Sequence, residues 1–309
     1  MISIQQMQYI LAVSDHRHFQ RASEVCFVTQ PTLSMQIKKA ENELGFMIFD
    51  RSTNPLSVTN FGVELIDIIR EIVNELEKIT KLTKTMSGSY IEKVRIGIIP
   101  TISAYLISDM FDKWKEVLPQ IQLSIEELKS EELLVSLEKK EIDLAILAGP
   151  IHQNNLRTIP LFSEEIKVYL PTATGDSVSS KELEGLHPWL LSKGNCLRTQ
   201  MIHFCGLQND IDDNWNYEGG NLEMLLRMVD VKGGYSLVPE EYQRVLKLDD
   251  TKCKRIYSSE NNEIPAREVI ALSPNKTSKW ESIEKIIRSI QLNYGKGENR
   301  TNLQILNWR

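Results

Sequence analysis

Apolar residues recur at helical spacing through the first sixty residues of the chain. Segments 4–14 and 19–26 each place their apolar side chains on one face, which predicts two amphipathic helices. A third helix is predicted from Thr29-Gln30-Pro31 onward, because a polar residue followed by proline marks a helix start. Its apolar positions are spaced by four, three and four residues, at Leu33, Ile37, Ala40 and Leu44. Three short helices around a small core are therefore expected.

The opposite face of the third predicted helix is polar and weakly basic. It carries Gln30, Thr32, Ser34, Met35, Gln36, Lys38 and Lys39. A short helix with such a face, after a tight turn, is typical of a recognition helix in the major groove of DNA. An ordinary solvent-exposed face has the same pattern, so the residues alone leave both interpretations open.

A long helix without proline is predicted from residue 59 to about 86. Its apolar residues alternate at intervals of four and three, with Thr83 in one gap, at Leu65, Ile69, Ile72, Leu76, Ile79 and Met86. Such heptads are typical of a coiled-coil dimer contact. Ile66, Ile68 and Val73 widen the stripe, so burial against a domain of the same chain is the alternative. Met86-Ser87-Gly88-Ser89 then ends the helix and is predicted to be a hinge.

Beyond residue 90 the pattern changes to short strand-like runs that alternate with helical stretches. Strands are predicted at 94–100, 123–125, 142–147, 166–170 and 268–272. Helices are predicted from about 103 and at 133–140, 222–231 and 279–290. Alternation of this kind predicts α/β layers. The tail 295–309 is polar and predicts no element. We therefore expect an α/β body behind a helical head.

The composition is typical of a soluble globular protein of about two domains. The chain has 309 residues, of which 41% are hydrophobic and 25% charged, within the usual range. Its first residues lack the basic start and apolar run of a signal peptide. No stretch approaches the ~20 apolar residues of a membrane span. We therefore expect a cytoplasmic protein with no membrane partner, whose four cysteines rest as thiols.

The net charge of −6 is unevenly distributed along the chain. Residues 1–60 carry five basic and five acidic side chains, so the remainder carries the whole negative charge. A neutral head on an acidic body is compatible with DNA binding but does not require it. Glycine-rich phosphate loops, His-Glu-x-x-His and Cys-x-x-Cys motifs are absent from the sequence, and the histidines lack metal-ligand spacing. We expect neither an enzyme nor a cofactor or metal.

Two of the four cysteines, Cys196 and Cys205, flank a segment with a helical pattern. If both lie on one helix, their nine-residue separation at ~1.5 Å per residue puts their Cα atoms roughly 13 Å apart. A disulfide needs Cα atoms within ~4.4–6.8 Å, so the pair could bond only if the helix unwound. Such a pair is either inert or a redox switch. Cys26, on an apolar helix face, and Cys253, without a partner by spacing, are interpreted as structural.

The head resembles the winged helix-turn-helix domain of LysR-type transcriptional regulators. The resemblance rests on Ala22-Ser23-Glu24-Val25-Cys26-Phe27-Val28-Thr29-Gln30-Pro31-Thr32-Leu33-Ser34-Met35-Gln36-Ile37, Glu43-Leu44-Gly45, Phe49-Asp50-Arg51 and Leu56-Ser57-Val58-Thr59. It implies a DNA-binding domain over 1–58, a dimerising linker helix and hinge over 59–90 and a regulatory domain over 91–309. By position, it implies that base contacts come from Gln30, Thr32, Ser34 and Lys38. It implies that Arg51 contacts the DNA backbone.

The body resembles the two-lobed effector domain of the same family, which is similar to periplasmic binding proteins. The resemblance implies a first lobe over about 91–163 and 267–309, and a second over about 164–266. It further implies self-association, with a tetramer as the family's usual state, and RNA polymerase as a protein partner. A small organic inducer in the cleft between the lobes is one interpretation of its signal.

The cysteine segment narrows the resemblance to LysR-family members that sense hydrogen peroxide. This resemblance rests on Asp15-His16-Arg17-His18-Phe19, Ile96-Gly97-Ile98-Ile99-Pro100-Thr101, Cys196-Leu197-Arg198 and Phe204-Cys205. It implies that Cys196 attacks peroxide, that Cys205 resolves the sulfenic acid into a disulfide, and that the switch controls oxidative-stress genes. It also implies a peroxide pocket formed by Thr101, Ser130, Gly194, Asn195, Arg198 and Arg267. Asn195 stands where the family usually has histidine.

The residues around Cys196 agree with that order of reaction. A peroxide-reactive cysteine must be a thiolate, stabilised by nearby positive charge or by a helix start. Cys196 opens the predicted helix, after Lys193 and the turn residues Gly194-Asn195, and Arg198 follows two positions later. Two other hypotheses remain: a regulator of the same fold that binds an organic inducer, and a thiol-dependent peroxidase with a vestigial head.

Overall fold

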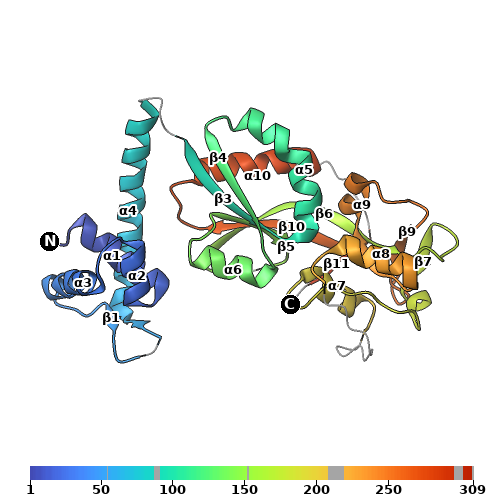
Figure 1. The fold of residues 1–309 in the computed structure, drawn as a ribbon, viewed down its shortest axis with the longest axis horizontal. Coiled ribbons are helices and arrows are strands. Elements are labelled where there is room, and N and C mark those ends of the chain that lie inside the picture. Colours follow the sequence, from blue (N-terminus) through green and yellow to red (C-terminus); the bar gives the residue numbers. More distant parts are fainter. Residues whose placement is uncertain (54, 87–90, 152, 208–218, 296–301, 308–309) are drawn as a thin grey trace. The chain divides into compact units, whose positions relative to one another are not determined.

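A computed structural model describes residues 1–53, 55–86, 91–151, 153–207, 219–295 and 302–307 (Figure 1). The chain divides into two compact units, which are described separately. One is built on Met1–Ile91 and is called the head. The other is built on Glu92–Leu137, Ile142–Asn275 and Glu281–Arg309 and is called the body.

The head consists of four helices and a small two-stranded wing. Its elements are α1 (Ile4–His16), α2 (Phe19–Val25), α3 (Gln30–Leu44), β1 (Phe49–Asp50), β2 (Ser57–Val58) and α4 (Asn60–Met86). The helix starts follow from local chemistry. Ser3 and Gln6 cap α1 reciprocally, with Ser3 N–H donating to Gln6 Oε1 and Gln6 N–H to Ser3 Oγ. Pro31 lies in the first turn of α3, and Gly45 ends that helix with a φ of 77°, a conformation that favours glycine.

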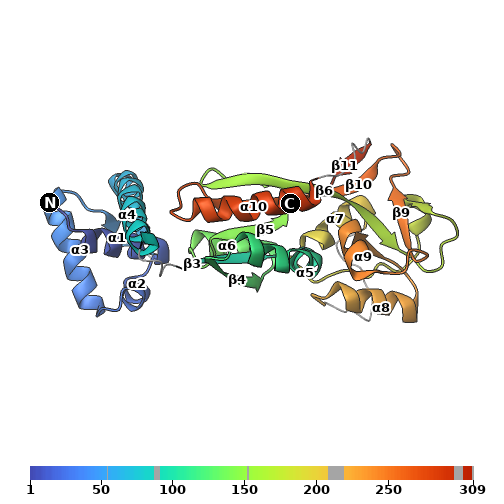
Figure 2. The ribbon, with the colours of Figure 1, turned by 90° about the horizontal axis from the view of Figure 1, so that it is seen from above.

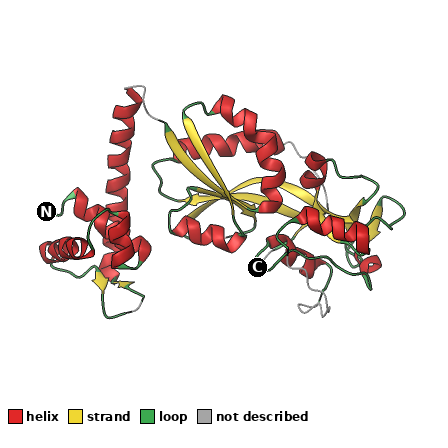
Figure 3. Cartoon of the chain, viewed as in Figure 1, coloured by secondary structure: helices red, strands yellow, loops and turns green. Residues whose placement is uncertain are grey.

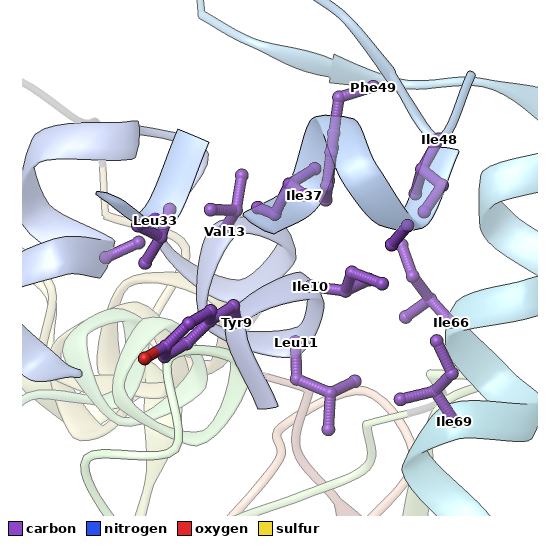
Figure 4. Packing of buried hydrophobic residues seen from close by; sticks show 12 residues of the cluster. Tyr9, Ile10, Leu11, Val13, Leu33, Ile37, Ile48, Phe49, Ile66 and Ile69 are labelled. Atoms are coloured by element: carbon purple, nitrogen blue, oxygen red, sulfur yellow. The ribbon is translucent and has the colours of Figure 1, made fainter. Parts of the chain in front are cut away.

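The core of the head is formed where α1, α3 and α4 meet (Figure 4). Ile10, Leu33 and Ile37 are fully buried there. Ile66 and Ile69 reach the same cluster from α4 (Figure 4). The predicted helical periodicity of the head is therefore explained by this packing.

Part of the predicted heptad stripe on α4 is used by the head itself. Ile69 is buried in the head core, and Leu65 and Val73 pack against it. Further along the helix, Ile72 is 39% and Ile79 is 59% exposed. The side chain of Met86 and the predicted hinge at 87–89 lie outside the described residues. The dimer contact stays a prediction, now centred on the exposed part of the stripe.

The body contains a nine-stranded mixed sheet with helices on both sides (Figure 3). Along the sheet, the strands are β4 (Ile121–Glu127), β3 (Glu92–Ile98), β5 (Leu144–Ala148), β10 (Ile264–Pro274), β6 (Leu156–Tyr169), β9 (Cys253–Tyr257) and β7 (Ser177–Ser179). Two further strands are β8 (Ser236–Pro239), which pairs with β6, and β11 (Leu303–Ile305), which pairs with β10. The predicted α/β body is confirmed.

Strand β6 is shared by two parts of the sheet (Figure 2). Residues 156–165 pair antiparallel with β10, and residues 166–169 continue into pairing with β8 and β9. The first lobe is the part around β3, β4 and β5 with α5 (Pro100–Val117), α6 (Ser130–Glu138) and α10 (Trp280–Tyr294). The second is the part around β7, β8 and β9 with η1 (Ser180–Leu183), α7 (Cys196–Phe204), α8 (Leu222–Lys232) and α9 (Glu240–Leu246).

Several elements differ from the predicted ones. The sequence predicts only residues 166–170 of β6. In the first half of this strand, Pro160 and a bulge in the pairing with β10 interrupt the alternation of apolar and polar residues. The tail, expected to carry no element, contributes β11, which pairs with residues 264–266. Strands β7, β8 and β9 and helix α9 are also absent from the predicted set, since their runs are short.

Leu33→Ala should destabilise the head, because Leu33 is fully buried in the core between its helices. The free energy of unfolding of the head is expected to fall by about 2–5 kcal/mol. Met35→Ala, on the exposed side of the same helix, is the matched control and should change it by less than about 0.5 kcal/mol. Urea unfolding followed by circular dichroism measures both. Equal effects would contradict this packing.

Candidate functional site

The two predicted switch cysteines lie at opposite ends of a single helix. Cys196 is the first residue of α7, and Cys205 is the residue that follows its last turn. Cys196 is only 2% exposed, whereas Cys205 is half-buried. All four cysteines are free thiols. The two cysteines therefore flank one continuous helix, as predicted, and a disulfide between them requires that helix to unwind.

The surroundings of Cys196 oppose and favour its ionisation at the same time. Burial raises the pKa of the Cys196 thiol above its ordinary value. The positive charge of Arg267, the Ser130 hydroxyl and the backbone N–H groups of Leu197 and Ala148 act in the opposite direction. Desolvation disfavours the thiolate, while positive charge and hydrogen-bond donors favour it. The reactivity of this thiol thus depends on a few neighbouring groups.

Arg267 is fully buried and is held by fixed partners. Its Nε donates to Glu164 Oε1 at 2.9 Å. Its two terminal nitrogens donate to the side chain and carbonyl oxygens of Thr101 at 2.9 and 3.1 Å. Thr101 lies in the first turn of α5, directly after β3, and Arg267 lies on β10. The structure thus brings together two residues that are far apart in the sequence.

Ser130 is the first residue of α6 and is fully buried. Its hydroxyl forms no hydrogen bond to a nitrogen or oxygen atom of the described residues. It acts on the Cys196 sulfur, where it lowers the pKa of the thiol. A buried hydroxyl without another fixed partner can donate to a thiolate or to an oxygen of a small molecule beside it.

The side chains on either side of Cys196 are hydrogen-bonded to the loop before α7. Asn195 is buried, and its amide donates to the carbonyl and hydroxyl oxygens of Ser192 at 2.9 and 3.1 Å. Arg198 donates to the Leu191 carbonyl at 2.9 Å. The positive charge expected from Arg198 is thus engaged with the loop, and Arg267 provides the charge that acts on Cys196.

Gly194 lies where the first lobe approaches this loop. Its φ of 87° favours glycine, and a Cβ at this position would lie 3.3 Å from Lys129 Cδ. The ammonium of Lys129 donates to the Lys193 carbonyl at 3.2 Å. Gly194 therefore allows a contact between the lobes immediately before Cys196.

Two residues around the other end of α7 were not identified from the sequence. Burial raises the pKa of Cys205 to about 11, and a hydrogen bond from Tyr235, a buried residue, acts against that rise. Gln200, in the middle of α7, is fully buried and donates to the Leu306 carbonyl at 3.0 Å. For the contact between Gln200 and Leu306, the only signal in the sequence is a glutamine on the inward-facing side of the helix, four residues after Cys196.

The predicted DNA-contacting residues of the head lie on α3 and the wing. Thr32 and Lys38 are exposed, and Gln30 and Ser34 are half-buried. Arg51 is tied to the head by ion pairing with Glu41 at 3.1 Å, and it donates to Ser34 Oγ at 3.4 Å. The structure therefore brings two of the predicted DNA-contacting residues, Arg51 and Ser34, into contact beside α3.

Two family models match this chain. Residues 4–63 match a bacterial regulatory helix-turn-helix protein of the lysR family, and residues 87–271 match the LysR substrate binding domain. The chain belongs to the LysR family. It is thus a DNA-binding regulator of transcription and not an enzyme. Within the described residues of this LysR-family chain, no helix is both long and apolar enough to span a membrane.

Named LysR-family relatives cover most of the chain. It is 31% identical over 242 residues to a hydrogen peroxide-inducible genes activator of Dickeya chrysanthemi, covering 77% of this chain and 79% of that one. It is 30% identical, over 77% of this chain and 79% of the relative, to the DNA-binding transcriptional dual regulator OxyR of Escherichia coli K12. A full-length OxyR variant from Pseudomonas aeruginosa has a TM-score of 0.69 and 27% identity, covering 94% of this chain and 95% of that chain.

Ser130→Ala should make the Cys196 thiol harder to ionise, because the hydroxyl that stabilises the thiolate is lost. Loss of a donor worth about 1 kcal/mol raises the pKa, so the thiolate fraction at pH values below the pKa should fall about fivefold. Ser130→Thr keeps a hydroxyl and should stay near the wild-type pKa. The thiolate ultraviolet absorbance, titrated against pH with Cys196→Ser as reference, measures both. An unchanged pKa in the alanine variant would contradict this contact.

Proposed function

We propose that this LysR-family regulator senses hydrogen peroxide through a thiol–disulfide switch between Cys196 and Cys205 and controls oxidative-stress genes. The observation that carries the proposal is the position of the two thiols at opposite ends of one helix. The names of the relatives, hydrogen peroxide-inducible genes activator and OxyR, support the same signal.

In the first step, the Cys196 thiolate attacks one oxygen of hydrogen peroxide. A sulfur–oxygen bond forms and the oxygen–oxygen bond breaks, so that Cys196 becomes a sulfenic acid and hydroxide leaves as water after protonation. The positive charge of Arg267 favours the attacking thiolate. The hydroxyl of Ser130, and that of Thr101 beside Arg267, are the donors assigned to the peroxide oxygens. Gly194, Asn195 and Arg198 shape the loop that closes this pocket.

In the second step, the Cys205 sulfur attacks the sulfenic sulfur of Cys196. A disulfide forms and water leaves. Helix geometry puts the two Cα atoms roughly 13 Å apart, and a disulfide needs ~4.4–6.8 Å. Helix α7 must therefore lose its helical form when the bond forms. The contacts of α7 with Tyr235 and Leu306 change with it, which gives the oxidised body a different packing.

The head converts this change into altered DNA binding. Helix α3 is assigned to the major groove, with Gln30, Thr32, Ser34 and Lys38 on bases and Arg51 on the backbone. The exposed apolar residues of α4, among them Ile72 and Ile79, are assigned to a dimer contact. A change in how dimers pair within a tetramer would alter the spacing of the heads on DNA, and with it the contact to RNA polymerase.

Cys205→Ser should abolish the intramolecular disulfide, because the sulfenic acid at Cys196 then lacks its resolving thiol. Peptide mapping after a stoichiometric dose of hydrogen peroxide measures the link between the two segments, and footprinting on promoter DNA measures its effect on binding. Cys253→Ser, which changes a buried cysteine of β9, is the matched control and should form the link as the wild type does.

Peroxide-dependent DNA binding that survives in Cys205→Ser would overturn the switch. If both thiols of the wild type stay reduced at doses that oxidise ordinary cysteines, the signal is a small organic molecule instead. In that case a specific metabolite should raise the melting temperature of the reduced protein, since a ligand that binds only the native state stabilises it.

A further inference from the structure

Glu164 lies at the centre of a buried hydrogen-bond network that includes Arg267. It is 1% exposed and stands directly opposite Arg267 in the pairing of β6 with β10. Its Oε1 accepts from Arg267 Nε at 2.9 Å and from the Tyr105 hydroxyl at 2.7 Å. Its Oε2 accepts from the Glu241 backbone N–H at 3.1 Å. Every described partner of this carboxylate is therefore a donor, as a buried anion requires.

The guanidinium of Arg267 contacts Glu164 and also acts electrostatically on Cys196. Burial opposes its charge, but Glu164, Tyr105 and Cys196 together raise the pKa of Arg267 above its ordinary value. In the other direction, Arg267 lowers the pKa of the Cys196 thiol. One cation thus contacts the Glu164 carboxylate and acts electrostatically on the Cys196 sulfur. In a low-dielectric site, an anion bound to one side of a cation reduces the field on the other side.

We propose that Glu164 is a positioning residue for Arg267 and the anion with which the Cys196 thiolate competes for its charge. Three hydrogen bonds fix the guanidinium, one to Glu164 and two to Thr101. The carboxylate therefore sets both the orientation of Arg267 and how much of its positive potential reaches the sulfur. The consequence for peroxide sensing rests on the proposed function, whereas the electrostatic relation itself does not.

Other ionisable groups also face this network. Tyr105 on α5 has a pKa raised well above its ordinary value, by burial first and by Glu164 second. Tyr294 on α10 packs against Tyr105 with ring centroids 5.9 Å apart and donates to Asp109 at 2.9 Å. On α9, Arg244 pairs with both Glu241, at 2.6 Å, and Asp109, at 3.0 Å. The charges of Arg244, Glu241 and Asp109 are thus paired with one another. The anion that Arg267 contacts directly is Glu164.

Glu164→Gln tests the competition with almost no change in shape. The amide oxygen can still accept from Arg267 and Tyr105, but the negative charge and the acceptor for the Glu241 N–H are gone. Because removal of an anion from the far side of Arg267 favours the thiolate, the pKa of Cys196 should fall. We expect a fall of about one unit, or about tenfold more thiolate at pH values below both pKa values. Thiolate ultraviolet absorbance titrated against pH, with the same variant carrying Cys196→Ser as reference, gives this readout.

Glu165→Gln is the matched control. Glu165 is the next residue on β6, is similarly buried, and is paired with Arg255 at 3.1 and 3.2 Å. Successive side chains of a strand point to opposite faces, so this variant makes the same charge change away from Cys196. Its Cys196 titration should match the wild type. A Glu164→Gln titration that equals that of Glu165→Gln, or a midpoint shifted upward, would overturn the proposal and leave Glu164 a purely structural residue.

A buried Arg267 without its counter-anion can prevent folding, since breaking a buried ion pair is strongly destabilising. Glu164→Asp then carries the test, because it keeps the charge but shortens the side chain by one methylene group. Its midpoint should fall in the same direction by a smaller amount, and an unchanged midpoint would contradict the proposal. The titration uses reduced protein without peroxide. A wild type that fails to form the disulfide would therefore refute the proposed function while leaving this inference intact.

Discussion

The buried ion pair between Arg267 and Glu164 is the constraint on which the body of this protein depends. Taking a guanidinium and a carboxylate out of water costs several kcal/mol for each ion, which only well-placed partners can offset. The pairing of β6 with β10 sets the two residues opposite each other. Thr101, Tyr105 and the Glu241 N–H occupy the remaining hydrogen-bonding positions. Since α5 and α9 belong to different lobes, the pair also joins the lobes.

The arginine of this pair also acts on Cys196, because its charge lowers the pKa of that thiol. Burial alone would leave a poorly ionised cysteine, comparable to Cys205 or Cys253, for each of which burial raises the pKa to about 11. Arg267 is the cation that acts on Cys196, whereas Lys167 and Lys254 act on Cys253 against the opposing charges of Asp249 and Asp250. In the proposed switch Cys196 is the attacking and Cys205 the resolving cysteine, and the charge of Arg267 acts on the first of them.

Helix α7 is held by contacts that a change in its shape would break. Gln200 binds the carbonyl of Leu306, next to β11, and β11 in turn pairs with β10 immediately before Arg267. The tail of the chain, the helix and the strand that carries the buried arginine are therefore neighbours. A rearrangement of α7 on disulfide formation would reach β11 and β10 through contacts of this kind.

The sequence by itself determined the features that depend on local order. Helical periodicity, the Thr29-Gln30-Pro31 helix start and the alternation of strands and helices predicted the head and the α/β class. The helical pattern of the segment between Cys196 and Cys205 predicted a helix there. Tertiary structure decided the partners of Arg267, the course of Arg198 toward Leu191, the role of Glu164 and the strand in the tail. These depend on contacts between residues dozens to more than a hundred positions apart, or on which way a side chain turns in a folded loop. Such contacts leave no repeating pattern in the sequence, because they form only when the folded chain brings the two residues together.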